Sequence, residues 1–145
     1  MVKGIHHIAI RAENMENTLK FYTEVLDFSI RKEWSLPQFN LKHAAMLKSA
    51  DGNTFIEVFD KDADIAAQGK KRSGNEEIVQ GALLHLAFTV DNATEMYEKA
   101  ISQGAKPFIE PSVLEIGNNP SIRVKNSLVY SPNGEVIEFI EENEF

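Results

Sequence analysis

A short phrase occurs twice in this chain, and the repeat limits the folds open to the sequence more than any other feature. His-Ile-Ala-Ile at residues 7–10 corresponds to His-Leu-Ala-Phe at residues 85–88, and a stretch with helical spacing follows each copy. A second match, Phe-Ile-Glu-Val at 55–58 against Val-Ile-Glu-Phe at 136–139, closes each half. Two similar halves within 145 residues predict two copies of one supersecondary unit that share a core in one domain.

The spacing of apolar residues predicts the same order of elements, β-α-β-β-β, in both halves. In the first half we expect strands at residues 5–12, 28–34, 41–47 and 54–59, and a helix from Asn14 to near Asp27. In the second half we expect strands at residues 83–90, 107–109, 121–130 and 135–141, a helix from Asp91-Asn92 to Gly104, and a loop at residues 115–120. The polar stretch between the halves breaks both periodicities. We therefore assign residues 1–60 to a first module, 61–81 to a connector and 82–145 to a second module.

One His and one Glu in each half stand on a strand face turned away from the predicted helices. Glu57, His85 and Glu138 each lie between two apolar residues, whose side chains must point to the opposite face of the strand. His7 precedes an apolar residue in the same way. A single His or Glu of this kind is more often a hydrogen-bonded or solvated residue than a ligand. The recurrence in both halves favours a shared cause, and imidazole and carboxylate are the usual protein ligands of a divalent metal ion.

The composition excludes several classes of function. A formal net charge of −7 and a pI near 5.1 argue against a nucleic-acid partner, which usually needs a basic protein surface. The chain has no cysteine, so nitrogen and oxygen atoms alone must hold any metal ion. No long apolar run or signal-like start is present. We expect a cytoplasmic protein that acts on a small molecule, without a membrane partner.

Short motifs along nearly the whole chain are similar to those of one known group of proteins. They are His7-Ile8-Ala9-Ile10, Phe21-Tyr22 and Val25-Leu26, His85 with Val90-Asp91-Asn92, and Ser131-Pro132-Asn133-Gly134 before Ile137-Glu138. With these residues the sequence resembles the glyoxalase I and vicinal oxygen chelate superfamily. The resemblance implies an α+β fold in which two tandem βαβββ modules form a cup-shaped, barrel-like mixed sheet with the helices outside. In glyoxalase I the metal ligands occupy the positions that match His7, Glu57, His85 and Glu138.

The resemblance also implies a reaction. It indicates a lyase or isomerase of glyoxalase I type, dependent on a divalent ion such as Zn, Ni, Co or Mn, which binds a substrate through two adjacent oxygens and stabilises the enediolate formed on proton loss. By resemblance Glu138 is the base, and Glu57 can serve on the opposite face. Two alternatives stay open: an isomerase like methylmalonyl-CoA epimerase, and a protein of the same fold that binds or sequesters a small molecule without chemistry.

The complete set of two His and two Glu favours glyoxalase-like chemistry among the relatives. As the family is generally described, the epimerases carry Gln at the position of Glu57, and the fosfomycin enzymes and dioxygenases use three protein ligands. Arg11 lies where a basic, substrate-binding residue is expected. The amide usually found shortly after the first Glu is replaced by Asp60-Lys61, which leaves the use of glutathione open.

The modules of this superfamily can pair within one chain or across two chains. The pair His7 and Glu57 can therefore share a metal ion with His85 and Glu138 of the same copy or of a second one. We expect a homodimer.

Overall fold

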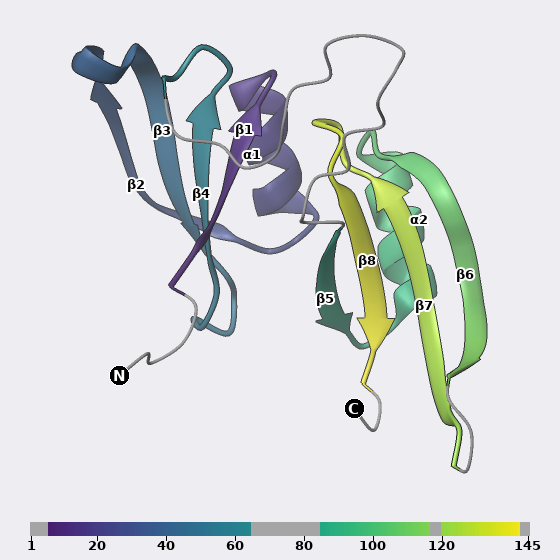
Figure 1. Ribbon diagram of the computed structural model, residues 1–145. Coiled ribbons are helices and arrows are strands. Elements are labelled where there is room, and N and C mark those ends of the chain that lie inside the picture. Colours follow the sequence, from purple (N-terminus) through teal and green to yellow (C-terminus); the bar gives the residue numbers. More distant parts are fainter. Residues whose placement is uncertain (1–5, 65–84, 117–119, 143–145) are drawn as a thin grey trace, which may run out of the picture.

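The computed structural model describes residues 6–64, 85–116 and 120–142, and it contains two modules with the same order of elements (Figure 1). The first comprises β1 (Ile8–Ala12), α1 (Met15–Glu24), β2 (Ser29–Leu36), the short 3-10 helix η1 (Pro37–Phe39), β3 (Leu41–Lys48) and β4 (Phe55–Asp60). The second comprises β5 (Leu86–Val90), α2 (Ala93–Ser102), β6 (Lys106–Ile116), β7 (Ile122–Tyr130) and β8 (Val136–Glu141). Residues 65–81 of the expected connector lie outside the described residues.

Both helices begin where their capping residues predict. The side chain of Asn14 accepts a hydrogen bond from the backbone N–H of Asn17, and the side chain of Asn92 accepts from Thr94 and Glu95. These bonds satisfy N–H groups that have no partner inside the first helical turn. The predicted helix starts are therefore confirmed.

Each module forms one four-stranded mixed sheet, with the orders β1-β4-β3-β2 and β5-β8-β7-β6. The first strand of each module pairs in parallel with the last, and the other pairs are antiparallel. Across the described residues the two sheets are not joined into a closed barrel. The α+β layout with paired modules is as predicted, and two curled sheets take the place of a continuous barrel wall.

Strand β6 is longer than the sequence predicts. We expected a strand at residues 107–109 and a loop at 115–120, but β6 runs through to Ile116 despite Pro107 and Pro111. The strand lies at the edge of its sheet, where a proline need not donate a ladder hydrogen bond. Its register with β7 shifts around Ile109, which accommodates the prolines. The loop prediction was therefore wrong for residues 115 and 116.

One hydrophobic core joins the helix-facing sides of both sheets. It includes Tyr22 of α1, Val58 of β4, Ala100 of α2 and Phe139 of β8, which are all fully buried. The rings of Phe28 and Phe88 meet edge to face across the two modules, with centroids 5.9 Å apart. The shared core leaves the opposite face of each sheet for the His and Glu side chains. No helix in the described ranges is long and apolar enough to cross a membrane.

Candidate functional site

The first module brings His7 and Glu57 together on the sheet face away from α1. Ala9 of β1 and Glu57 of β4 are register partners, and His7 lies two residues before Ala9 on the same face. The His7 Nε2 and Glu57 Oε2 atoms are 3.2 Å apart. Ile56 and Val58, the chain neighbours of Glu57, are buried in the core on the other face. Strand alternation thus anchors the backbone of Glu57 while its carboxylate points to the open side.

The second module repeats this geometry. Ala87 of β5 is the register partner of Glu138 of β8, and the His85 Nε2 and Glu138 Oε2 atoms are 3.1 Å apart. The side chain of Glu138 is 13% exposed, against 42% for His85. Ile137 and Phe139 are fully buried on the opposite face. The same backbone arrangement therefore produces the same His–Glu pair twice.

The donor separation in each pair is compatible with two ligands of one divalent metal ion, and also with a direct hydrogen bond between imidazole and carboxylate. Ligand bonds of about 2.1 Å that meet at an octahedral or tetrahedral angle place two donor atoms roughly 3.0–3.4 Å apart. The nitrogen–oxygen separations of 3.2 and 3.1 Å lie in this interval. The geometry of each pair is therefore consistent with the predicted ligands.

The two pairs do not form one site within a single chain. Among the described residues, which include all four candidate ligands, no group of three or more His, Asp or Glu side chains is placed to hold one metal ion. Each module therefore supplies half of the predicted ligand set, and the assignment of these residues as ligands stays a prediction.

Two further residues contact the pairs and were not predicted as site residues. The Nδ1 atom of His6 is 2.9 Å from Nδ1 of His7, and its ring stacks on Phe55. The Nδ2 atom of Asn126, on β7, donates a hydrogen bond of 2.6 Å to Oε1 of Glu138. Sequence reasoning missed Asn126 because the corresponding position of the first half carries no matching polar residue. Its place in an otherwise apolar alternation on β7 is the only sequence signal that could have found it.

Arg11 is engaged with the backbone of its own module. Its Nη1 atom donates to the carbonyl oxygens of Lys61 and Ala63, at 2.9 and 2.8 Å. These bonds hold the chain after β4 across the open face of the first sheet, where Ala63 packs on Leu41 and Ala44. The predicted substrate contact of Arg11 stays a prediction, and the structure adds a structural task for the same guanidinium group.

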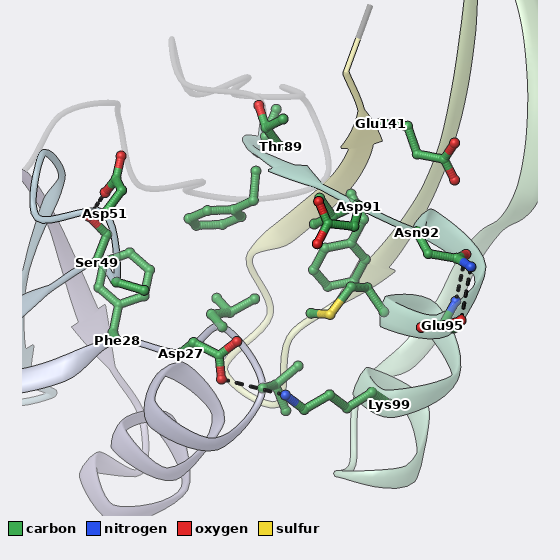
Figure 2. Close-up of a pocket in the computed structure, with 18 of the residues that line it drawn as sticks. Asp27, Phe28, Ser49, Asp51, Thr89, Asp91, Asn92, Glu95, Lys99 and Glu141 are labelled. Atoms are coloured by element: carbon green, nitrogen blue, oxygen red, sulfur yellow. Dashed lines mark hydrogen bonds and ion pairs between the residues drawn. The ribbon is translucent and has the colours of Figure 1, made fainter.

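An open groove of about 1020 Å³ lies between the modules, away from the His–Glu pairs (Figure 2). Its walls combine apolar side chains such as Phe28 and Met96 with many carboxylates. Among the described residues that line the groove, Lys99 is the single positively charged one, and its Nζ lies 3.6 Å from the carboxylate of Asp27. None of the four candidate ligands lines this groove. The candidate site is therefore identified by its donor atoms and not by this groove.

Known structures resemble this fold over nearly its whole length. A glyoxalase family protein from Enterococcus faecalis is 27% identical, with a TM-score of 0.65, and the match covers 96% of this chain and 98% of that one. Glyoxalase I from Zea mays is 19% identical with a TM-score of 0.65, over 94% of this chain and 43% of that one. The fosfomycin resistance protein FosX from Listeria monocytogenes, solved with Mn(II) and a sulfate ion, is 14% identical with a TM-score of 0.61, over 98% and 94%.

Two comparisons of the sequence gave different results. A search of curated protein sequences found no match to the chain. The family model described as the Glyoxalase/Bleomycin resistance protein/Dioxygenase superfamily matches residues 4–139, which include all four candidate ligands. The chain therefore belongs to the Glyoxalase/Bleomycin resistance protein/Dioxygenase superfamily, as its motifs predicted.

Proposed function

We propose that this protein is a divalent-metal-dependent lyase or isomerase of glyoxalase I type, with His7, Glu57, His85 and Glu138 as its metal ligands. The observation that carries the proposal is the repeated His–Glu pair, with donor separations of 3.2 and 3.1 Å on equivalent strands of the two modules. The imidazoles of the two pairs are 37% and 42% exposed, and a His–Glu contact with so exposed a partner contributes little to stability by itself. Recurrence at both sites therefore favours ligand binding over a structural role.

We infer that a second copy of the chain completes each site. Each copy offers two pairs that are not combined within the chain, so two copies can form two complete sites if the first module of one faces the second module of the other. This arrangement uses every pair once.

Exposed apolar side chains beside Glu138 support pairing with a second copy. Ile109 and Leu114 of β6 are register partners of Leu128 and Val124 of β7, and Leu128 in turn pairs with Glu138. Register partners point to one face of a sheet. Ile109 and Leu114 are 42% and 47% exposed, and an exposed apolar patch next to polar groups commonly marks an interaction surface.

The chemistry follows from the carboxylates. These four residues would hold a divalent ion, and the ion would supply Lewis-acid chemistry to a substrate with two adjacent oxygens, which makes the neighbouring C–H more acidic. Glu138 then removes the proton, and Glu57 can act on the opposite face of the substrate. The two imidazoles hold their positions throughout. The proposed substrate class is a small molecule with two neighbouring oxygens.

A small-molecule-binding protein without chemistry is the second candidate. The observation in its favour is that the described residues of one chain offer no group of three ligands. An epimerase that acts on a 2-substituted acyl thioester would use the same proton transfer and needs a substrate test. The metal content of the purified protein separates the two candidates, because a protein that contains no metal ion favours sequestration over catalysis.

The test combines elemental analysis, light scattering and an activity screen on the full chain. We expect a dimer that holds one divalent ion per chain and turns over the methylglyoxal–glutathione hemithioacetal or methylmalonyl-CoA. A metal-free or monomeric protein would contradict the proposal.

Mixing two variants tests whether the sites lie between chains. His7→Ala and His85→Ala each damage both sites of their own dimer, and we expect each to weaken metal affinity by at least about 100-fold, more than the loss of an outer contact. In a mixed dimer, one site combines both substitutions and the other contains neither. We therefore expect mixing after subunit exchange to restore one intact site per mixed dimer. If the site lay within one chain, mixing would restore nothing.

A further inference from the structure

A buried amide lies beside the candidate ligand Glu138. Asn126 is 6% exposed, and its Nδ2 donates to Oε1 of Glu138 at 2.6 Å. An ionised carboxylate only accepts hydrogen bonds, so the amide must present its N–H to Glu138 and direct its Oδ1 elsewhere. This contact occupies one oxygen of Glu138. The other oxygen, Oε2, lies 3.1 Å from Nε2 of His85.

The remaining polar atom of Asn126 has no hydrogen-bond partner among the residues that the structure describes. Its Oδ1 is buried and accepts no hydrogen bond from the described protein. Buried polar atoms in native proteins are almost always hydrogen-bonded, because a buried polar atom without a partner destabilises the folded state. The Nδ2 atom of the same amide lies 2.6 Å from Oε1 of Glu138, so a molecule bound beside this candidate ligand can bring the donor that Oδ1 lacks.

The first module has no equivalent of this amide. Met46 is the register partner of Glu57 and Leu128 is that of Glu138, so the residue two positions earlier is Ala44 in one module and Asn126 in the other. Ala44 has no polar side chain, and it packs under Ala63 in a small apolar cluster. The two carboxylates thus differ in their support, although their His partners lie at similar distances.

We propose that Asn126 is the positioning residue of Glu138 and the acceptor for a hydroxyl group of the substrate. The inference rests on the proposed function and adds a substrate class to it, namely molecules whose two neighbouring oxygens include a hydroxyl. Nδ2 holds Oε1 of Glu138, so that Oε2 is the oxygen left to bind a metal ion or, when it is not bound to the ion, to take up a proton. Oδ1 accepts the substrate O–H. Because the first module lacks the amide, only Glu138 receives this support.

Calorimetric titration with Ni²⁺ tests the positioning role without turnover. Asn126→Ala introduces the residue that the first module has at the equivalent position, Ala44. Asn126→Leu fills the space without polar atoms. Circular dichroism checks that both variants fold. We expect each to weaken Ni²⁺ affinity by about 10–100-fold, the usual loss when an outer partner of a ligand is removed. In a Glu138→Gln background the same substitution should change affinity less than about 3-fold, and in a Glu57→Gln background the full loss should remain.

A pair of small acids tests the acceptor role on the Ni²⁺-loaded protein. Lactate offers a hydroxyl beside its carboxylate, and 2-methoxypropanoate is the matched acid without that donor. We expect the wild-type protein to prefer lactate and the Asn126 variants to lose the preference. An unchanged preference would overturn the acceptor role.

The outcomes separate this inference from the proposed function. If the wild-type protein binds Ni²⁺ and the Asn126 variants bind equally well, the positioning role is wrong and the proposed function stands. An equal loss in both Glu→Gln backgrounds also overturns the positioning role, because it points to a general disturbance. A wild-type protein that binds no Ni²⁺ overturns both.

Discussion

The two modules differ less in their His–Glu pairs than in what surrounds those pairs. The donor separations are 3.2 Å in the first module and 3.1 Å in the second. In the first module the additional contact is made to the imidazole, by His6. In the second it is made to the carboxylate, by Asn126. A duplicated backbone thus reproduces the placement of the ligands, whereas unmatched neighbouring residues make the two halves chemically unequal.

The hairpin turns before the last strand of each module show a second difference. Ser131 and Gly134 are bonded to each other through the backbone in the same way as Ser49 and Gly52, which makes Asn133 the counterpart of Asp51. Asn133 reaches the other module: its Oδ1 accepts from the N–H of Glu13, and its Nδ2 donates to the carbonyl of Arg11, both at 2.7 Å. These two bonds tie the second module to the end of β1.

Asp51 folds back on its own turn instead. Its carboxylate accepts hydrogen bonds from the Ser49 hydroxyl and from the backbone and side chain of Asn53. An amide both donates and accepts, but a carboxylate only accepts, so Asp51 cannot donate to a carbonyl of the second module. Figure 2 shows Asp51 and Asp91 on opposite sides of the groove that lies here. One junction between the modules is therefore tied, and the other is open.

The largest expected effect tests whether the two carboxylates are unequal. We expect Glu138→Gln to lower kcat by about 10²–10⁴-fold, the usual contribution of a general base, while metal binding is at least partly retained. Glu57→Gln should lower kcat less. Steady-state kinetics with the best substrate of the screen and elemental analysis of both variants provide the measurement. Wild-type turnover in Glu138→Gln, or equal losses in both variants, would contradict the assigned roles.

A reciprocal exchange tests the two turns. Asn133→Asp removes the donor to the carbonyl of Arg11 and places a carboxylate beside Glu135, whose side chain Asn133 also contacts. We expect the free energy of unfolding to fall by about 1–3 kcal/mol. Asp51→Asn keeps an acceptor in its turn and should change stability by less than about 0.5 kcal/mol. Urea denaturation measures both, and equal destabilisation would show that the turns do not differ in this way.

The smallest expected effect concerns stability in acid. Asp60 and Glu141 are the register partners of Ala12 and Val90, so they hold equivalent positions at the ends of β4 and β8. Burial tends to raise the pKa of Asp60, but hydrogen bonds from the backbone N–H groups of His43, Lys42 and Asp62 lower it overall. The Lys125 side chain, and then the N–H of Ala93, lower the pKa of Glu141.

A carboxyl group whose pKa is lowered on folding stabilises the protein above the unfolded pKa of about 4, and the stabilisation is lost as the pH falls through the folded value. We therefore expect Asp60→Asn to flatten the fall of the unfolding free energy below about pH 4. Glu141→Gln should flatten it less, because the partly exposed side chain of Lys125 supplies the contact that lowers its pKa most. Denaturation at a series of pH values measures both slopes, with the exposed Asp91→Asn as control. Equal slopes for Asp60→Asn and the wild-type protein would contradict the assigned contacts.

Much of the fold could be read from local patterns. Asn14 and Asn92 predicted both helix starts, because a capping side chain acts on N–H groups only two or three residues away. Strand alternation likewise predicted which face carries Glu57 and Glu138, since the period of two is a local property of the backbone. The length of β6 was missed because Pro107 and Pro111 interrupt a central strand but are tolerated at a sheet edge.

The sequence by itself determined the duplicated βαβββ units, the superfamily and the identity of the four candidate ligands. Each of these follows from residues that lie close together in the chain or that recur at equivalent positions of the two halves. Only the tertiary structure decided that each His meets the Glu of its own module, that Asn126 supports one carboxylate, and that Asn133 ties one junction while the other stays open. These contacts join residues far apart in sequence. They depend on strand register and on the packing of one module against the other, which no local pattern encodes.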